Sequence, residues 1–242
     1  MGCSSSSEAS HPSSAAAKGK PGCLNCCVDI SYFGGMQGRA GPLILMFEHH
    51  GQQYRRCDET RESWNASKAT PGKVCDVGGG LPQICCNCDG KTVKMCQFAS
   101  MMRHFGCRFG YYNRRNLNEV RFVDPIVDTF PDVMNLFAKA CFVPDSEKAA
   151  GCEAFLTFVK RWHKMIESYL CCHKGKFAAG NNLTIADFVL AAYCANLLCN
   201  PNNPMSQQMK ACCSETPKFH AYIMSVGENF PYLKTRPPIP AF

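Results

Sequence analysis

The stretch that decides the fold is VDISYFGGMQGRA, residues 28–40. Val28, Ile30 and Tyr32 alternate with polar residues, which is the period of a half-buried β-strand. Glycines then form a turn, and the apolar residues after Gly38 have the spacing of a helix. The stretch therefore predicts a strand and a helix joined by a turn, with an aromatic side chain at the end of the strand.

Signals of the same kind continue as far as residue 110. The helix is predicted over 38–50, and residues 53–57 form a candidate second strand. Asp89-Gly90 separates two further strand candidates and is typical of a type I′ hairpin between antiparallel strands. Residues 97–108 have helical spacing again. The predicted order is strand, helix, strand, irregular stretch, strand, strand, helix.

Beyond residue 110 the apolar residues recur every three or four positions, which predicts the core faces of long helices. One face consists of Leu117, Val120, Val123, Val127, Phe130, Met134 and Phe137. A second face consists of Cys152, Phe155, Val159, Trp162, Ile166 and Tyr169. A third helix is predicted at Thr184, whose hydroxyl is expected to accept from a backbone amide while Asp187 completes a capping box. Thr216-Pro217 opens a fourth helix as N-cap and first residue.

Length and composition limit the classes of protein that need to be considered. The chain has 242 residues with 46% hydrophobic content, which is enough for two compact domains. No apolar run reaches the ~18 residues of a membrane span. The net charge of +7 is spread over the chain without the aromatic-interleaved basic stripe of a nucleic-acid binder, so no nucleic-acid partner is predicted.

The chain contains 19 cysteines. The first residues have no apolar core of a signal peptide, so we expect reduced thiols and not an extracellular disulfide framework. Cys23-x-x-Cys26 and Cys85-Cys86-x-Cys88 have the form of half a zinc site each. Neither is followed by a second such pair, and the Cys85 cluster alternates along a predicted strand, so no metal site is predicted.

The N-terminus carries a lipidation pattern. Met1 is followed by Gly2, which fits N-myristoylation, and by Cys3, a candidate for palmitoylation. Residues 1–22 have no periodicity and little apolar content, which predicts a disordered, acylated tether to the cytoplasmic face of a membrane. The alternative is a disordered tail in which the short motif occurs by accident.

At this point the chain resembles a cytosolic glutathione transferase, closest to the sigma class and its alpha, mu and pi relatives, from about Val28 to Phe230. The resemblance rests on YFGGMQGRA, LPQI before the hairpin, QFASMMRHF, VDPIVDTFPDVMNLF and NNLTIADF. It implies an α/β thioredoxin-like N-terminal domain over residues 23–110 and an all-α C-terminal helical domain over 111–242. Members of the family are dimers, which implies a homodimer here.

The resemblance also implies how the tripeptide glutathione would be held. A thiol with an ordinary pKa of about 8.5 is mostly protonated near neutral pH, so a transferase gains rate by stabilising the thiolate. Tyr32 matches the catalytic tyrosine whose hydroxyl does this, and Arg39 would add positive potential nearby. Trp64 and Lys68 lie four residues apart, face one way if the segment is helical, and match the groups that bind the glycine carboxylate.

Five further positions are implied by the same resemblance. The backbone of Leu81 would pair with the cysteinyl backbone, beside a cis Pro82. Gln97, at the start of a helix, would meet the γ-glutamyl end, where the helix dipole favours a carboxylate. Phe98 stands where the family usually has a serine, so that only its backbone amide can bind there. Asp132 matches the acid that crosses the dimer interface to the γ-glutamyl amine.

Purely structural interpretations of these residues remain open. Tyr32 can be a half-buried strand aromatic, Trp64 and Lys68 an amphipathic surface pair, and Asp132 a solvated helix acid.

Two classes of function are consistent with the sequence. The first is an enzyme that conjugates glutathione, its co-substrate, to hydrophobic electrophiles, or isomerises a peroxide such as a prostaglandin precursor; no other cofactor is predicted. The second is a non-catalytic relative that binds hydrophobic ligands or is structural, as lens crystallins of this family are. Candidates for the apolar cleft are Phe137, Cys141 and Phe142.

Overall fold

The computed structural model describes residues 28–75, 79–88, 91–231 and 233. The predictions for Gly2, Cys3 and the rest of residues 1–22 concern residues outside these ranges, as do those for Cys23, Cys26 and the turn Asp89-Gly90. None of the helices within the described ranges is long and apolar enough to cross a membrane. Within the same ranges, no group of three or more potential ligand side chains is arranged to hold a metal ion.

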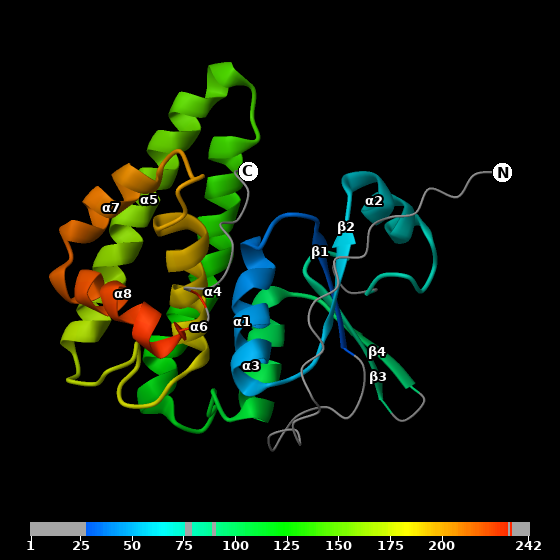
Figure 1. Cartoon of the computed structure of the whole chain (residues 1–242), viewed down its shortest axis with the longest axis horizontal. Coiled ribbons are helices and arrows are strands. Elements are labelled where there is room, and N and C mark those ends of the chain that lie inside the picture. The colour runs from blue at the N-terminus through cyan, green and yellow to red at the C-terminus, as the bar shows by residue number, and fades with distance from the viewer. Residues whose placement is uncertain (1–27, 76–78, 89–90, 232, 234–242) are drawn as a thin grey trace.

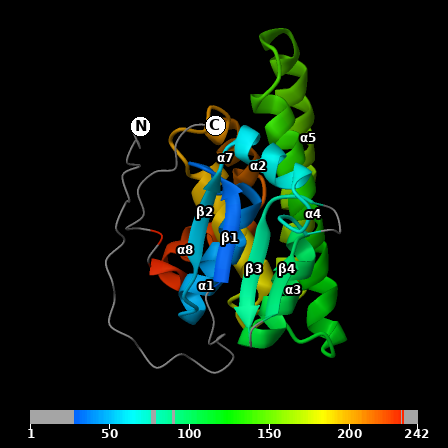
Figure 2. The same cartoon turned by 90° about the vertical axis from the view of Figure 1, so that its right-hand side faces the viewer.

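The N-terminal half is a four-stranded mixed sheet with three helices. Its elements are β1 (Val28–Phe33), α1 (Gly41–His50), β2 (Arg55–Glu59), α2 (Arg61–Ala69), β3 (Gln83–Cys88), β4 (Lys91–Met95) and α3 (Phe98–Phe109). The strand order is β2-β1-β3-β4, with β1 and β2 parallel and the other pairs antiparallel (Figure 2). Helices α1 and α3 lie between the sheet and the second half, and α2 lies on the far side of the sheet (Figure 1).

Several predicted elements differ in the structure. The stretch predicted to be irregular contains α2, and α3 spans Phe98–Phe109 where 97–108 was predicted. The second strand begins at Arg55, two residues later than predicted, because its parallel register pairs Arg55 with Asp29. An ion pair of 2.7 Å between these two side chains supports that register. The first helix is preceded by a 3₁₀ turn over Gly38–Ala40, and α1 ends at Gly51, whose positive φ of 81° closes it as a left-handed cap.

The second half is helical. It contains α4 (Leu117–Cys141), α5 (Asp145–Cys171), α6 (Ile185–Tyr193), a π-helical turn (Cys194–Leu198), α7 (Ser206–Ser214) and α8 (Pro217–Asn229). The predicted core faces of α4 and α5 are buried except at their ends. Leu117, placed on the first face, is 73% exposed because it is the first residue of α4 and the buried part of that helix begins at Phe122. The sequence interpretation also missed α7 and the π-helical turn, since SQQMKACCS has no clear apolar stripe.

The capping box at Thr184 is confirmed. The side chain of Asp187 accepts from the backbone N–H of Thr184 at 2.8 Å, and the Thr184 side chain accepts from the backbone N–H of Asp187. The Thr184 hydroxyl also donates to the Asp187 carboxylate at 2.9 Å. The fully buried carboxylate also accepts from the N–H of Ala178 and the hydroxyl of Tyr222, both at 2.8 Å. Burial raises the pKa of Asp187, opposed by these hydrogen bonds. Asp187 therefore joins three segments of the helical half and has a structural role.

Candidate functional site

Tyr32 is the centre of the candidate site. It lies near the end of β1, is 7% exposed, and its hydroxyl accepts a hydrogen bond of 3.1 Å from the backbone N–H of Arg39. A Cβ atom at Gly38 would overlap that hydroxyl oxygen, and Gly38 has a positive φ of 37°. Glycine is thus required for the turn to close over the ring. Because the oxygen accepts from Arg39, the phenolic proton is left to donate to a ligand.

The loop between Tyr32 and this turn is held by a residue that the sequence interpretation missed. One terminal nitrogen of Arg56, on β2, donates to the carbonyl oxygens of Phe33, at 2.9 Å, and of Met36. The Nε of Arg56 donates to Asp58 at 2.6 Å and forms an ion pair with it. In the sequence Arg56 is one of many basic residues, and nothing local marks it as the partner of a loop twenty residues earlier. Arg56 thus positions the chain that leads from Tyr32 to Arg39.

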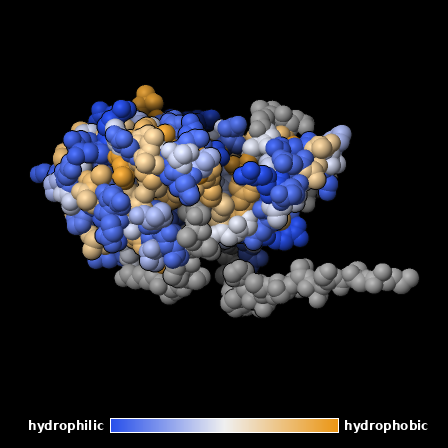
Figure 3. Space-filling model, turned by 90° about the horizontal axis from the view of Figure 1, so that it is seen from above, coloured by the Kyte–Doolittle hydropathy of each residue, from blue (hydrophilic) through white to orange (hydrophobic). Residues whose placement is uncertain are grey.

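A pocket of about 450 Å³ opens beside the Tyr32 ring, between the loop after β1 and the C-terminal part of α4. Figure 3, which views the molecule from this end, shows apolar surface between the two halves. Phe137 and Phe142 line the pocket, as predicted, and the third candidate, Cys141, does not. Charged side chains stand at the wall formed by β2 and α2. The lining consists of Tyr32, Phe33, Gly34, Met36, Gly38, Arg39, Glu59, Thr60, Arg61, Met134, Asn135, Phe137, Ala138 and Phe142.

The predicted pair Trp64 and Lys68 does lie on a helix. Thr60 caps α2 through a reciprocal pair of hydrogen bonds with Ser63, of 3.1 and 2.9 Å. The two side chains differ in their surroundings, since Trp64 is buried in the core and Lys68 is exposed. Neither lines the pocket at Tyr32. Their role towards a tripeptide stays a prediction.

The predicted backbone features around β3 and α3 are present. The peptide bond between Leu81 and Pro82 is cis, and both residues are buried just before β3. Gln97 has a φ of 71°, a left-handed value that non-glycine residues rarely adopt. Holding a side chain there costs about 1–3 kcal/mol, and residues with such backbone strain cluster at ligand sites. The exposed Gln97 stands directly before α3, beside the first backbone amides of that helix.

Phe98 is buried, whereas Asp132 is exposed. The Phe98 ring is 4% exposed and packs on Phe130 of α4, with centroids 5.4 Å apart. Its side chain therefore belongs to the contact between α3 and α4, and its backbone N–H lies in the first turn of α3. Asp132 is exposed on α4, as a residue on a contact surface or a solvated acid would be.

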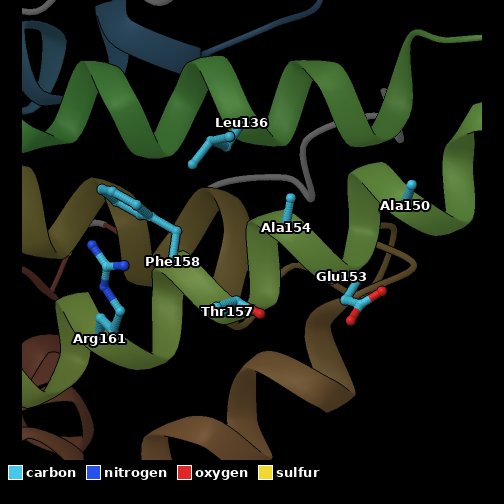
Figure 4. Close-up of a pocket in the computed structure, with 7 residues that line it drawn as sticks. All are labelled: Leu136, Ala150, Glu153, Ala154, Thr157, Phe158 and Arg161. Atoms are coloured by element: carbon cyan, nitrogen blue, oxygen red, sulfur yellow. The ribbon is translucent and has the colours of Figure 1, made fainter.

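A second hollow, of about 460 Å³, lies between α4 and α5 (Figure 4). Leu136 and Phe158 face one another across it, with Glu153 and Arg161 among the residues at its edge. Its other lining residues are Ala150, Ala154 and Thr157. None of the predicted glutathione residues lines this hollow, so it is separate from the pocket at Tyr32.

Comparison with known proteins agrees with this geometry. Residues 131–231 match the family model described as glutathione S-transferase, C-terminal domain. A curated relative, probable glutathione S-transferase 7 of Caenorhabditis elegans, is 25% identical over 87% of this chain and 97% of its own length.

Solved structures show the same fold. The monomeric glutathione S-transferase Na-GST-3 of Necator americanus is 22% identical, with a TM-score of 0.66 over 87% of this chain and 97% of that one. The sigma class glutathione transferase of Fasciola hepatica is 21% identical, with a TM-score of 0.65 over 88% of this chain and 97% of that one.

Proposed function

We propose that this chain is a cytosolic glutathione transferase that holds the glutathione thiolate with the Tyr32 hydroxyl for attack on an apolar electrophile. The observation that carries the proposal is the position of that hydroxyl. It is fixed by the N–H of Arg39 at 3.1 Å, and its ring forms part of the wall of a largely apolar pocket. One side of the pocket comes from the N-terminal half of the fold and the other from α4 and the residue after it.

The chemistry needs little beyond this arrangement. A hydrogen bond from the phenol to the sulfur favours the thiolate over the thiol and lowers the pKa of bound glutathione. The Arg39 N–H polarises the phenol and makes it a better donor. The sulfur then attacks the electrophilic carbon, a C–S bond forms, and a leaving group or an opened double bond takes the electron pair. The thiol proton passes to solvent when the thiolate forms.

The remaining residues are proposed to bind the tripeptide. Lys68 and Trp64 would hold the glycine carboxylate, and the Leu81 backbone beside cis Pro82 would pair with the cysteinyl residue. Gln97 and the backbone N–H of Phe98 would bind the γ-glutamyl end at the start of α3, where amides and dipole favour an anion.

The proposed assembly is a homodimer in which Asp132 of each copy would reach the γ-glutamyl amine bound to the other. The exposure of Asp132 on α4 is consistent with such a contact. The monomeric Na-GST-3 shows that not every protein of this fold described in a crystal is a dimer.

Two narrower alternatives are kept. The first is isomerisation of a lipid-derived peroxide, implied by the sigma-type resemblance of the sequence, as a second use of the same thiolate. The burial of the Phe98 side chain, where the family usually offers a serine hydroxyl, favours a non-catalytic ligand-binding or structural protein. We further propose that acyl chains on Gly2 and Cys3 hold the protein at a membrane surface, where apolar electrophiles concentrate.

The test uses immobilised glutathione and a generic aryl halide. The proposal expects retention on the glutathione column and conjugation that falls about 10²–10³-fold in Tyr32→Phe, as for loss of one donor to a developing charge. A protein that binds glutathione but conjugates nothing belongs to the non-catalytic class. Equal rates for wild type and Tyr32→Phe would remove the tyrosine from the mechanism.

A further inference from the structure

Two cysteines of the helical half lie in contact, and neither is among the residues proposed to bind glutathione. Cys194 begins the π-helical turn after α6, and Cys199 follows that turn. Their sulfur atoms are 3.6 Å apart. Cys199 is exposed, whereas Cys194 is 9% exposed. The pair therefore combines one thiol open to solvent with one that is almost covered.

The wide turn is what brings the two sulfurs together. In an α-helix the residue four positions on lies above a given residue, and the fifth is rotated away from it. Here the backbone N–H of Cys199 donates to the carbonyl oxygen of Cys194 at 2.8 Å, a bond across five residues. That widening moves Cys199 over Cys194. Single π-turns of this kind are frequent at functional sites.

The surroundings make the two thiols chemically unequal. The hydrogen bond between the two thiols, helped by Lys210 on α7, lowers the pKa of Cys199 to about 7. The same hydrogen bond and burial raise the pKa of Cys194. Since the thiolate is the reacting form, Cys199 is suited to attack and Cys194 to act second.

We propose that Cys199 and Cys194 form a thiol–disulfide site that reacts with glutathione disulfide. The Cys199 thiolate attacks one sulfur of glutathione disulfide, whose S–S bond breaks, and one glutathione leaves and takes up a proton. The Cys194 thiol then gives its proton to solvent and attacks the Cys199 sulfur, expelling the second glutathione as a thiolate that is protonated in turn. Two protein thiols are oxidised to one disulfide, and one glutathione disulfide is reduced to two glutathione molecules.

Closing the disulfide needs a local change only. The sulfurs, which belong to residues five positions apart, must approach from 3.6 Å to a bond of about 2.05 Å. Neither cysteine lines the pocket at Tyr32. The thiol–disulfide site and the proposed transferase activity can therefore be tested independently of each other.

The positions of lysine and arginine allow the two cysteines to be followed in a single tryptic peptide. Trypsin releases residues 177–210 as one peptide, which contains Cys194 and Cys199 and no other cysteine. Residues 104–108 form a second peptide with Cys107, an exposed cysteine on α3 that serves as the matched control. The full-length protein is equilibrated with mixtures of glutathione and glutathione disulfide, and the reaction is quenched in acid. The free thiols are then alkylated, the protein is digested, and the peptide masses are measured by mass spectrometry.

The proposal expects the 177–210 peptide to be two hydrogen atoms lighter than its reduced form and to carry no alkyl group on either cysteine. The disulfide should outnumber the alkylated form by about tenfold or more in mixtures that leave Cys107 mostly alkylated, because the second step is intramolecular. In Cys194→Ser, and equally in Cys194→Ala, the reaction should stop with one glutathione attached to Cys199. Cys199→Ser should give neither product.

Three results would overturn the proposal of a thiol–disulfide site. One is full alkylation of both cysteines in mixtures that already modify Cys107. Another is an oxidised or glutathionylated 177–210 peptide in Cys199→Ser, which would assign the attack to Cys194. The third is a Cys194→Ser protein in which Cys199 takes up no glutathione while circular dichroism shows the native fold.

Discussion

The ring of Phe98 lies against the ring of Phe130, with centroids 5.4 Å apart, so the side chain at this position fills the contact between α3 and α4. We expect Phe98→Ser to destabilise the protein by about 3–5 kcal/mol, the usual cost of removing a buried aromatic ring. Urea denaturation measures the loss. Phe98→Leu is the control, because a hydrophobic replacement of similar size usually costs less than about 1.5 kcal/mol.

Affinity separates this structural role from a ligand role. If the core contact governs the position, neither variant should bind glutathione more tightly by calorimetry, as long as each is folded. A Phe98→Ser protein of native stability that binds glutathione more tightly would show that the ring is dispensable and that the missing serine limits affinity.

The contact of Gly38 with the Tyr32 hydroxyl gives a second prediction. In Gly38→Ala the new methyl group would overlap the phenolic oxygen, so the ring has to move, and conjugation should fall as steeply as in Tyr32→Phe. Gly35→Ala is the matched control, since Gly35 also has a positive φ, of 74°, but has open space around its Cβ position. It should cost about 1 kcal/mol of stability and leave turnover near the wild-type rate. Equal loss of turnover in both variants would contradict this.

His163 predicts how stability changes with pH. It is buried against the Tyr193 hydroxyl at 2.6 Å, and burial lowers its pKa to about 4. In the unfolded chain its pKa is about 6.5, so between these values the unfolded state binds a proton that the folded state does not. Stability should therefore fall as pH drops from about 6.5 towards 4, by about 3 kcal/mol in total from this group.

Two glutamine variants check the assignment to His163. His163→Gln can keep a hydrogen bond to Tyr193 without titrating, and should flatten the slope of unfolding free energy against pH in this range. His220→Gln, at an exposed position on α8, should leave the slope unchanged. An unchanged slope in His163→Gln would assign the acid sensitivity to other groups.

Gly2 and Cys3 give a prediction about location. Gly2→Ala should release the protein from membranes entirely, because myristoylation needs that glycine. Cys3→Ser should leave weak, reversible binding, since one myristoyl chain holds a protein only marginally. Fractionation of cells that express the wild type and both variants measures this. Equal solubility of all three proteins would reduce residues 1–22 to a tail without an anchoring role.

The elements of the fold were largely predictable because their signals are local. The alternation at Val28–Phe33 and the three-and-four spacing in α4 and α5 follow from burying one face, and the capping box at Thr184 occupies four consecutive positions. The cis bond before Pro82 came from the family pattern and is present, whereas α2, which carries Trp64, lies where the sequence predicted an irregular stretch.

Several features that were missed depend on distant contacts or on local departures from a regular period. Arg56 reaches a loop on the neighbouring strand, and Phe98 finds its partner Phe130 on another helix. The contact of Cys194 with Cys199 exists only because the helix widens there, and a regular period would have put the two thiols on different faces. Pattern reading on a single chain has no access to such pairings.

The central claim, that the Tyr32 hydroxyl stabilises the thiolate, is tested most directly by titrating the thiol of bound glutathione through its ultraviolet thiolate absorbance. Loss of about 2–4 kcal/mol of thiolate stabilisation corresponds to a rise of about 1.5–3 in the pKa of the thiol. The pKa of bound glutathione should therefore lie well below about 8.5 in the wild type and return close to that value in Tyr32→Phe. Tyr54→Phe is the control, because the Tyr54 hydroxyl donates to Glu48 and its side chain does not line the pocket. It should titrate like the wild type. The same low pKa in wild type and Tyr32→Phe, with glutathione bound in both, would contradict the account.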